Sequence, residues 1–123
     1  MKAREVLQMV DDLDPNQIEP MHKLVWLCRI EEQIWREIVC THEGAEQVPP
    51  VGSRIGEERE MIAPDAYCDV YRFYLAAQIA LSNAELERYN AAVEAFNAAY
   101  STFQDWYNRT HMPKYQARRL RFL

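Results

Sequence analysis

The side chains that could perform chemistry in this chain are few and scattered. The nearest approach to a metal site is formed by Cys40, His42 and Glu43, whose side chains all belong to types that bind metals. Three near neighbours at the expected end of a helix cannot easily surround one ion, and a fourth ligand is missing. The Glu-x-x-His motif of di-iron bundles is also absent from the sequence. We therefore predict neither a metal nor a cofactor.

Signatures of catalysis are missing as well. The sequence contains no GxGxxG motif, no Walker loop and no nucleophile elbow. Adjacent carboxylates such as Glu31 and Glu32 point apart on a helix, so they do not form an acid–base pair. We predict that the chain is not an enzyme.

A basic, aromatic segment at the C-terminal end is the strongest candidate for binding a partner. Five of the fourteen basic residues and no acid lie in 109–123, which carries +5, whereas the other 108 residues hold nine bases and nineteen acids, or −10. Such a tail could neutralise phosphates without sequence preference, or dock on an acidic surface of another copy or another protein. The candidate partner-binding residues are Lys114, Tyr115, Arg118, Arg119, Arg121 and Phe122.

Composition places the chain among globular proteins. With 123 residues, 49% of them hydrophobic and 27% charged, it is large enough for one hydrophobic core and too apolar for a disordered chain. No apolar run approaches the ~18 residues of a membrane span, and no signal peptide is apparent. We expect no membrane association and synthesis in a cytoplasm, where the three cysteines stay reduced.

Hydrophobic spacing predicts two helices in the first third of the chain. Residues three and four apart form one apolar face in a short first helix, namely Ala3, Val6, Leu7 and Val10. The second helix should begin near Pro20, which suits a first helical position, and run to about His42. From 43 to 63 the helical pattern disappears, which predicts a long irregular loop. A short hairpin between 48–51 and 59–62 is the alternative for this segment.

The remaining sequence predicts an αα-hairpin. Asp65 is placed to cap a third helix, whose apolar stripe comprises Tyr67, Val70, Tyr74, Ala77 and Leu81. Ser82 and Glu85 match a capping box, so a fourth helix should follow with almost no loop. Its apolar seam keeps an unbroken 3, 4 alternation through Leu86, Tyr89, Val93, Phe96, Tyr100, Phe103 and Tyr107.

Alanines repeat at intervals of seven on another side of this fourth helix, at Ala84, Ala91 and Ala98. They indicate either simple helix propensity or a face that packs closely against a neighbouring subunit, which we take as the candidate oligomer face. Together these patterns predict an all-α fold: a small bundle of about four helices with a long C-terminal αα-hairpin. The helical domain spans 1–109, including the irregular loop, and the basic tail spans 110–123.

Three stretches of the sequence carry a family resemblance. Residues 2–17 (KAREVLQMVDDLDPNQ), 24–42 (LVWLCRIEEQIWREIVCTH) and 65–113, which begins DAYCDVYRFYLAAQIALSNAELERYN, resemble small structural proteins of tailed bacteriophages and prophages. Within that group the chain is most similar to the head–tail connectors, also called neck adaptors. The resemblance covers most of the chain outside the long loop.

The resemblance implies a helical protomer that assembles into a ring with copies of itself, between the portal and the tail of the virion. DNA would pass through such a ring without sequence-specific contact, and the C-terminal segment would reach the portal protein. The expected location is the virion neck, after synthesis in the host bacterial cytoplasm. A different class of function also fits the sequence, namely a small helical nucleic-acid-binding or regulatory module that uses the basic tail.

Overall fold

The computed structural model describes residues 1–42 and 56–111 and confirms the all-α prediction. In this part of the chain there are four α-helices and two short 3₁₀ turns. The helices are α1 (Ala3–Leu13), α2 (Pro20–Glu37), α3 (Asp69–Ser82) and α4 (Leu86–Thr110), and the turns are Val39–Thr41 and Asp65–Tyr67. None of these helices is both long enough and apolar enough to cross a membrane.

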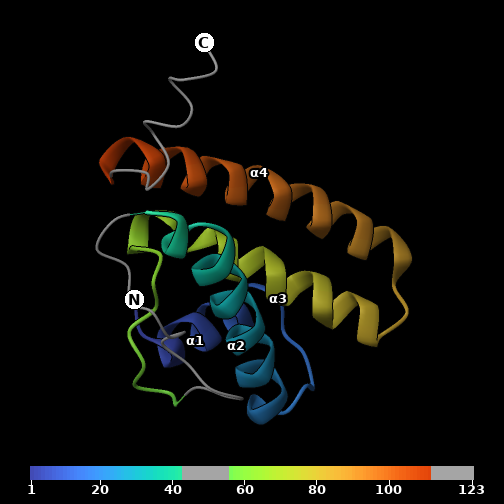
Figure 1. The fold of residues 1–123 in the computed structure, drawn as a ribbon. Helices are drawn as coiled ribbons and strands as arrows, with labels where there is room; N and C mark the ends of the chain where they lie inside the picture. Colours follow the sequence, from blue (N-terminus) through green and yellow to red (C-terminus); the bar gives the residue numbers. More distant parts are fainter. Residues whose placement is uncertain (43–55, 112–123) are drawn as a thin grey trace.

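The predicted αα-hairpin is formed by α3 and α4, which lie side by side and antiparallel (Figure 1). Helices α1 and α2 pack against α3 and against each other, below the hairpin in the view of Figure 1. The 25-residue α4 is far longer than the 14-residue α3. Its second half therefore extends beyond the start of α3, over the turn Asp65–Tyr67.

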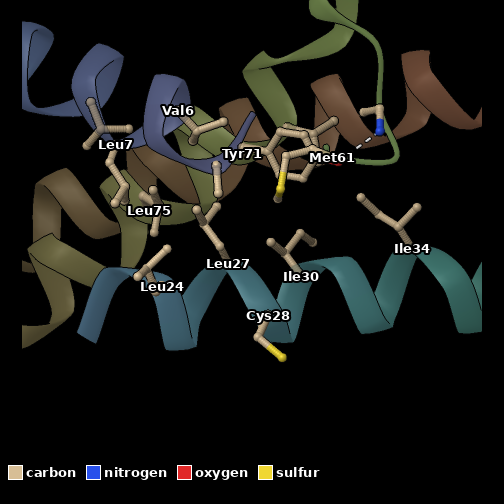
Figure 2. Close-up of a cluster of buried hydrophobic side chains, with 14 of the residues drawn as sticks. Val6, Leu7, Leu24, Leu27, Cys28, Ile30, Ile34, Met61, Tyr71 and Leu75 are labelled. Carbon is tan, nitrogen blue, oxygen red and sulfur yellow. Dashed lines mark hydrogen bonds between the residues drawn. The ribbon is translucent and has the colours of Figure 1, made fainter. Parts of the chain in front are cut away.

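The core lies where α1, α2 and α3 meet (Figure 2). The predicted apolar face of α1 is confirmed, since all four of its residues are buried. Pro20 is the first residue of α2, as expected. Leu27 and Ile30 of that helix are fully buried against Tyr71 and Leu75 of α3, and Met61 closes the cluster.

Helix α2 ends at Glu37, earlier than the predicted end near His42. Side chains compete for the carbonyl group of Ile38: the hydroxyl of Thr41 donates to it at 2.7 Å, and Nδ1 of His42 lies 2.6 Å from it. These local contacts offer the backbone an alternative to the next helical hydrogen bonds. The chain accordingly tightens into the 3₁₀ turn Val39–Thr41.

The segment after the long loop pairs with the beginning of the chain. Lys2 forms an antiparallel bridge with Glu60, the amide of Ala3 donates to the carbonyl of Arg59, and the amide of Met61 donates to that of Met1. The described half of the alternative hairpin, 59–62, is therefore occupied by residues 1–3. Its other half, 48–51, lies outside the described residues.

The prediction that Asp65 caps the third helix is wrong. Residues Asp65–Tyr67 form a 3₁₀ turn, and α3 begins at Asp69 after Cys68. The carboxylate of Asp65 instead lies 2.7 Å from the amino group of Met1. Because Cys68 occupies the N-cap position of α3, the carboxylate of Asp65 is too far along the chain to cap that helix.

Candidate interaction surface

The connection between α3 and α4 determines which side of α4 faces outward. Ser82 is the last residue of α3, so the predicted capping box at Ser82 and Glu85 is wrong. The turn is a Schellman motif: the amide of Glu85 donates to the carbonyl of Ala80 at 2.9 Å, and the amide of Ala84 donates to that of Leu81 at 3.1 Å. Ala84 has a φ of 56°, the left-handed conformation that this motif requires and that glycine usually supplies.

The apolar seam predicted for the fourth helix is only partly covered. Its second half packs on the core, with Phe103 fully buried and Phe96, Tyr100 and Tyr107 partly buried. At the other end Leu86 is 68% exposed. The reason is position: α1 and α2 pack mainly on α3, and the connection between them comes near the first turns of α4 only on the side of Arg88 and Ala91, away from Leu86.

Aromatic stacking fixes the second half of α4 to the turn before α3. The ring of Tyr67 lies 5.0 Å from that of Trp106 and 5.9 Å from that of Phe103, between ring centroids. On the other side of the helix, the hydroxyl of Tyr100 donates to the carboxylate of Glu37 at 2.8 Å. These contacts determine the rotation of α4 about its own axis, and so define its outward face.

His42 attaches the end of α4 to the end of α2. Its ring is almost fully buried, with Nε2 2.9 Å from the side-chain oxygen of Asn108 and its centroid 4.8 Å from that of Tyr107. The ring of His111 stacks on Tyr107 at 3.8 Å. His42 therefore acts here as a packed, hydrogen-bonded side chain.

The other members of the metal-like cluster are not gathered around His42. The thiol of Cys40 donates to the carbonyl of Arg36 at 2.9 Å, and Glu43 lies outside the described residues. Within 1–42 and 56–111, no group of three His, Cys, Asp or Glu side chains is arranged to hold a metal ion.

The candidate oligomer face is arranged differently from its sequence pattern. Ala91 and Ala98 are exposed on the same side of α4, as the seven-residue spacing requires. Ala84 lies in the turn before the helix and does not extend that face. Ala95 lies between these two alanines and Thr102 lies beyond Ala98, so the four residues form a 3, 4 series. Neither Ala95 nor Thr102 was identified from the sequence. The signal that could have identified them is this second 3, 4 series, which runs beside the aromatic one.

This side of α4 borders a groove along the αα-hairpin. At one end there is a cavity of about 390 Å³, formed by Ala95, Ala98 and Thr102 of α4 opposite Asp69 and Phe73 of α3. At the other end is a cavity of about 320 Å³ between Arg88 and Ala91 of α4, Ala76 and Ala80 of α3, and Asp14 and Pro15 of the connection between α1 and α2. Alanines make up much of both linings, so the groove has few large side chains along α4.

Charged residues are found at the two ends of the groove. Arg88 pairs with Glu85 at 3.1 Å, and Arg72 lies 3.9 Å from Asp69, in both cases between exposed side chains. Asp105 is exposed on α4 one turn beyond Thr102. Exposed pairs of this kind contribute little to folding, so their charges remain accessible to a partner.

The six predicted partner-binding residues, from Lys114 to Phe122, lie outside the described residues. The sequence matches no known family model, no curated protein and no solved structure.

Proposed function

We propose that this chain is a structural protein of the tailed-phage neck, a head–tail connector that associates with copies of itself and joins the portal to the tail. The observation that carries the proposal is the exposed side of α4. A helix of 25 residues is fixed by aromatic contacts on one side and presents a small-residue groove on the other. Such a rigid rod with an accessible face is suited to contacts between protomers.

The distribution of charge supports a second contact, with the portal. The chain outside 109–123 carries −10, and the tail carries +5. An acidic body does not attract DNA, so DNA could pass such an assembly without being held. The basic tail, with aromatic and aliphatic side chains among its arginines, offers both charge and apolar anchors to an acidic protein surface.

The experiment is a binding assay between the full chain and the portal protein of the same phage or prophage. We expect a complex that a chain ending at residue 111 no longer forms, while the truncated chain keeps the helical circular dichroism of the full chain. The control is a chain of full length in which Arg118, Arg119 and Arg121 are replaced by glutamine. It should bind the portal more weakly but still fold.

The same variants separate this function from a nucleic-acid-binding module. In that case the full chain would bind DNA with an affinity that falls steeply with salt concentration, the truncated chain would lose that affinity, and the portal would not bind at all. This outcome would overturn the connector proposal.

A further inference from the structure

The exposed side of α4 carries a second series of residues at 3, 4 spacing, separate from the aromatic series that packs on the core. Its members are Arg88, Ala91, Ala95, Ala98, Thr102 and Asp105. All are exposed except Ala95, which is half-buried in the groove. A strict two-in-seven pattern is the pattern by which one helix packs along another. Within the described residues α3 borders this series along one side and Asp14 and Pro15 border it near Arg88, but all its members except Ala95 stay exposed.

The two ends of this series have opposite charges. Arg88 and Asp105 are 17 positions apart, which places them about 26 Å apart along the axis at ~1.5 Å per residue. Between them stand only small side chains. A partner helix that presents an acid near Arg88 and a base near Asp105, at the same separation, would be complementary to this series.

A second copy of α4 is such a partner when it runs in the opposite direction. In the antiparallel register that places Ala95 opposite the partner's Ala98, Ala91 faces the partner's Thr102. Arg88 then faces the partner's Asp105, and by symmetry Asp105 faces the partner's Arg88. The series is thus complementary to itself in both shape and charge.

Other arrangements of two α4 helices lose this match. A parallel pair in register places arginine opposite arginine and aspartate opposite aspartate, which is repulsive. Moving the antiparallel pair by one heptad leaves Asp105 opposite the partner's Ala95 in one direction, or Arg88 opposite the partner's Ala98 in the other. The charges therefore select a single direction and a single register.

The groove provides further complementary charge. Asp69 of α3 borders the same end of the groove as Thr102, so a helix lying there would bring the partner's Arg88 toward two carboxylates. The existing partner of Arg88, Glu85, is itself exposed and does not bury the guanidinium group. The ring of Phe73 and the small side chains along the groove supply apolar contact area.

We propose that the free protein forms a two-fold symmetric dimer through antiparallel packing of α4 on the α4 of a second copy, with reciprocal Arg88–Asp105 ion pairs at its ends. A two-fold interface closes on itself, so a chain paired in this way cannot use the same face in a ring. The dimer is thus a state that precedes assembly. That last step rests on the proposed connector function, whereas the dimer itself does not.

The test is analytical ultracentrifugation of the full chain between about 1 µM and 1 mM, the range in which weak dimers are resolved. The mean molecular mass of the wild-type protein should rise with concentration, from that of one 14.5 kDa chain toward that of two. Arg88→Glu and Asp105→Arg should each weaken dimerisation about tenfold or more, because each replaces two attractive pairs with two repulsive ones.

Mixing the two variants gives the sharpest outcome. The Arg88→Glu chain has an acid at both ends of the series and the Asp105→Arg chain has a base at both ends. An equimolar mixture should therefore form mixed dimers at least as well as the wild type. Rescue by mixing also demonstrates that both variants are folded.

The control is Asn97→Arg, which also introduces an arginine on α4 but at an exposed position turned about 100° away from Ala98. It should dimerise like the wild type. A wild type that stays monomeric up to 1 mM, or that forms larger species without a dimer, would overturn the proposal. So would a dimer that Arg88→Glu and Asp105→Arg leave unchanged. None of these results depends on portal binding, so a failure here is distinguishable from a failure of the connector function.

Discussion

The hydroxyl of Tyr71 donates a hydrogen bond of 2.5 Å to the carboxylate of Glu31, in the middle of an otherwise apolar core. The other oxygen of Glu31 accepts from the amide of Ile62 at 2.9 Å, and the amide of Ala63 donates to the Tyr71 hydroxyl at 2.8 Å. One buried carboxylate and one buried phenol thereby join α2, α3 and the end of the long loop. Buried polar groups of this kind are costly unless each of them is satisfied.

Replacing Tyr71 with phenylalanine should destabilise the protein by about 1–3 kcal/mol, because both Glu31 and the amide of Ala63 lose a buried partner. Urea unfolding followed by circular dichroism measures this change. The matched control is Tyr89→Phe on the partly exposed side of α4, where a change within about 0.5 kcal/mol is expected. Equal changes in the free energy of unfolding for the two variants would show that the buried hydrogen bonds of Tyr71 do not stabilise the protein.

Glu31 should give the protein a distinctive pH dependence. Burial raises the pKa of its carboxyl group above the usual value of 4.5, although the hydrogen bonds from Tyr71 and Ile62 oppose the shift. The folded state therefore holds this proton more tightly than the unfolded state does. The contribution of Glu31 is most favourable below pH 4.5 and is lost as the pH rises through the folded-state pKa.

The variant Glu31→Gln isolates this contribution, because glutamine does not titrate. Its free energy of unfolding, relative to the wild type, should become more favourable as the pH rises from about 4 through the folded-state pKa, whatever the absolute cost of the substitution. Chemical denaturation at several pH values measures the difference. A difference that stays constant with pH would contradict the raised pKa.

The turn between α3 and α4 offers a stabilising substitution. Ala84 has a left-handed φ, in which its Cβ is crowded by the backbone. Ala84→Gly removes that crowding and should stabilise the protein by about 1 kcal/mol in thermal or urea unfolding. Ala91→Gly, in the interior of α4, should do the opposite and cost about 1 kcal/mol. A loss of stability in Ala84→Gly would count against the Schellman motif.

The two ends of the aromatic seam should respond differently to truncation. Phe103 is fully buried, so Phe103→Ala should cost about 3–5 kcal/mol of stability. Leu86 is 68% exposed, so Leu86→Ala should change stability by less than about 0.5 kcal/mol. Similar losses at both positions would mean that the first turn of α4 is covered in the folded protein.

Much of the fold was predictable because the spacing of apolar residues indicates which side of each helix is buried. The residues Ala3, Val6, Leu7 and Val10 indicated α1 and its buried side, and Pro20 marked the start of α2. Local signals at helix ends were less informative. Ser82 and Glu85 have the spacing of a capping box, but the chain there closes a Schellman motif around Ala84, a position where glycine would have been the usual signal.

Periodicity also does not reveal which face is covered. Helix α4 has two series at 3, 4 spacing, one aromatic and one small, and the spacing alone does not say which part of either series is covered. Only packing against α2 and the turn at Tyr67 shows that the aromatic series is covered near Phe103 and open near Leu86. The burial of Glu31 was unpredictable for a similar reason, since its partners Tyr71 and Ile62 are brought to it by tertiary structure alone.

The central claim, that the outward side of α4 is an assembly surface, is tested most directly by comparing two adjacent exposed positions of that helix. Ala98 lies in the groove, and Asn97 beside it does not contribute to the groove. Sedimentation equilibrium of the full chain should show self-association that Ala98→Glu abolishes and Asn97→Glu preserves. Both variants should have similar thermal unfolding midpoints at about 1 µM, where the weak dimer is dissociated. A wild-type chain that does not associate, or a loss of association that is the same in both variants, would contradict the claim.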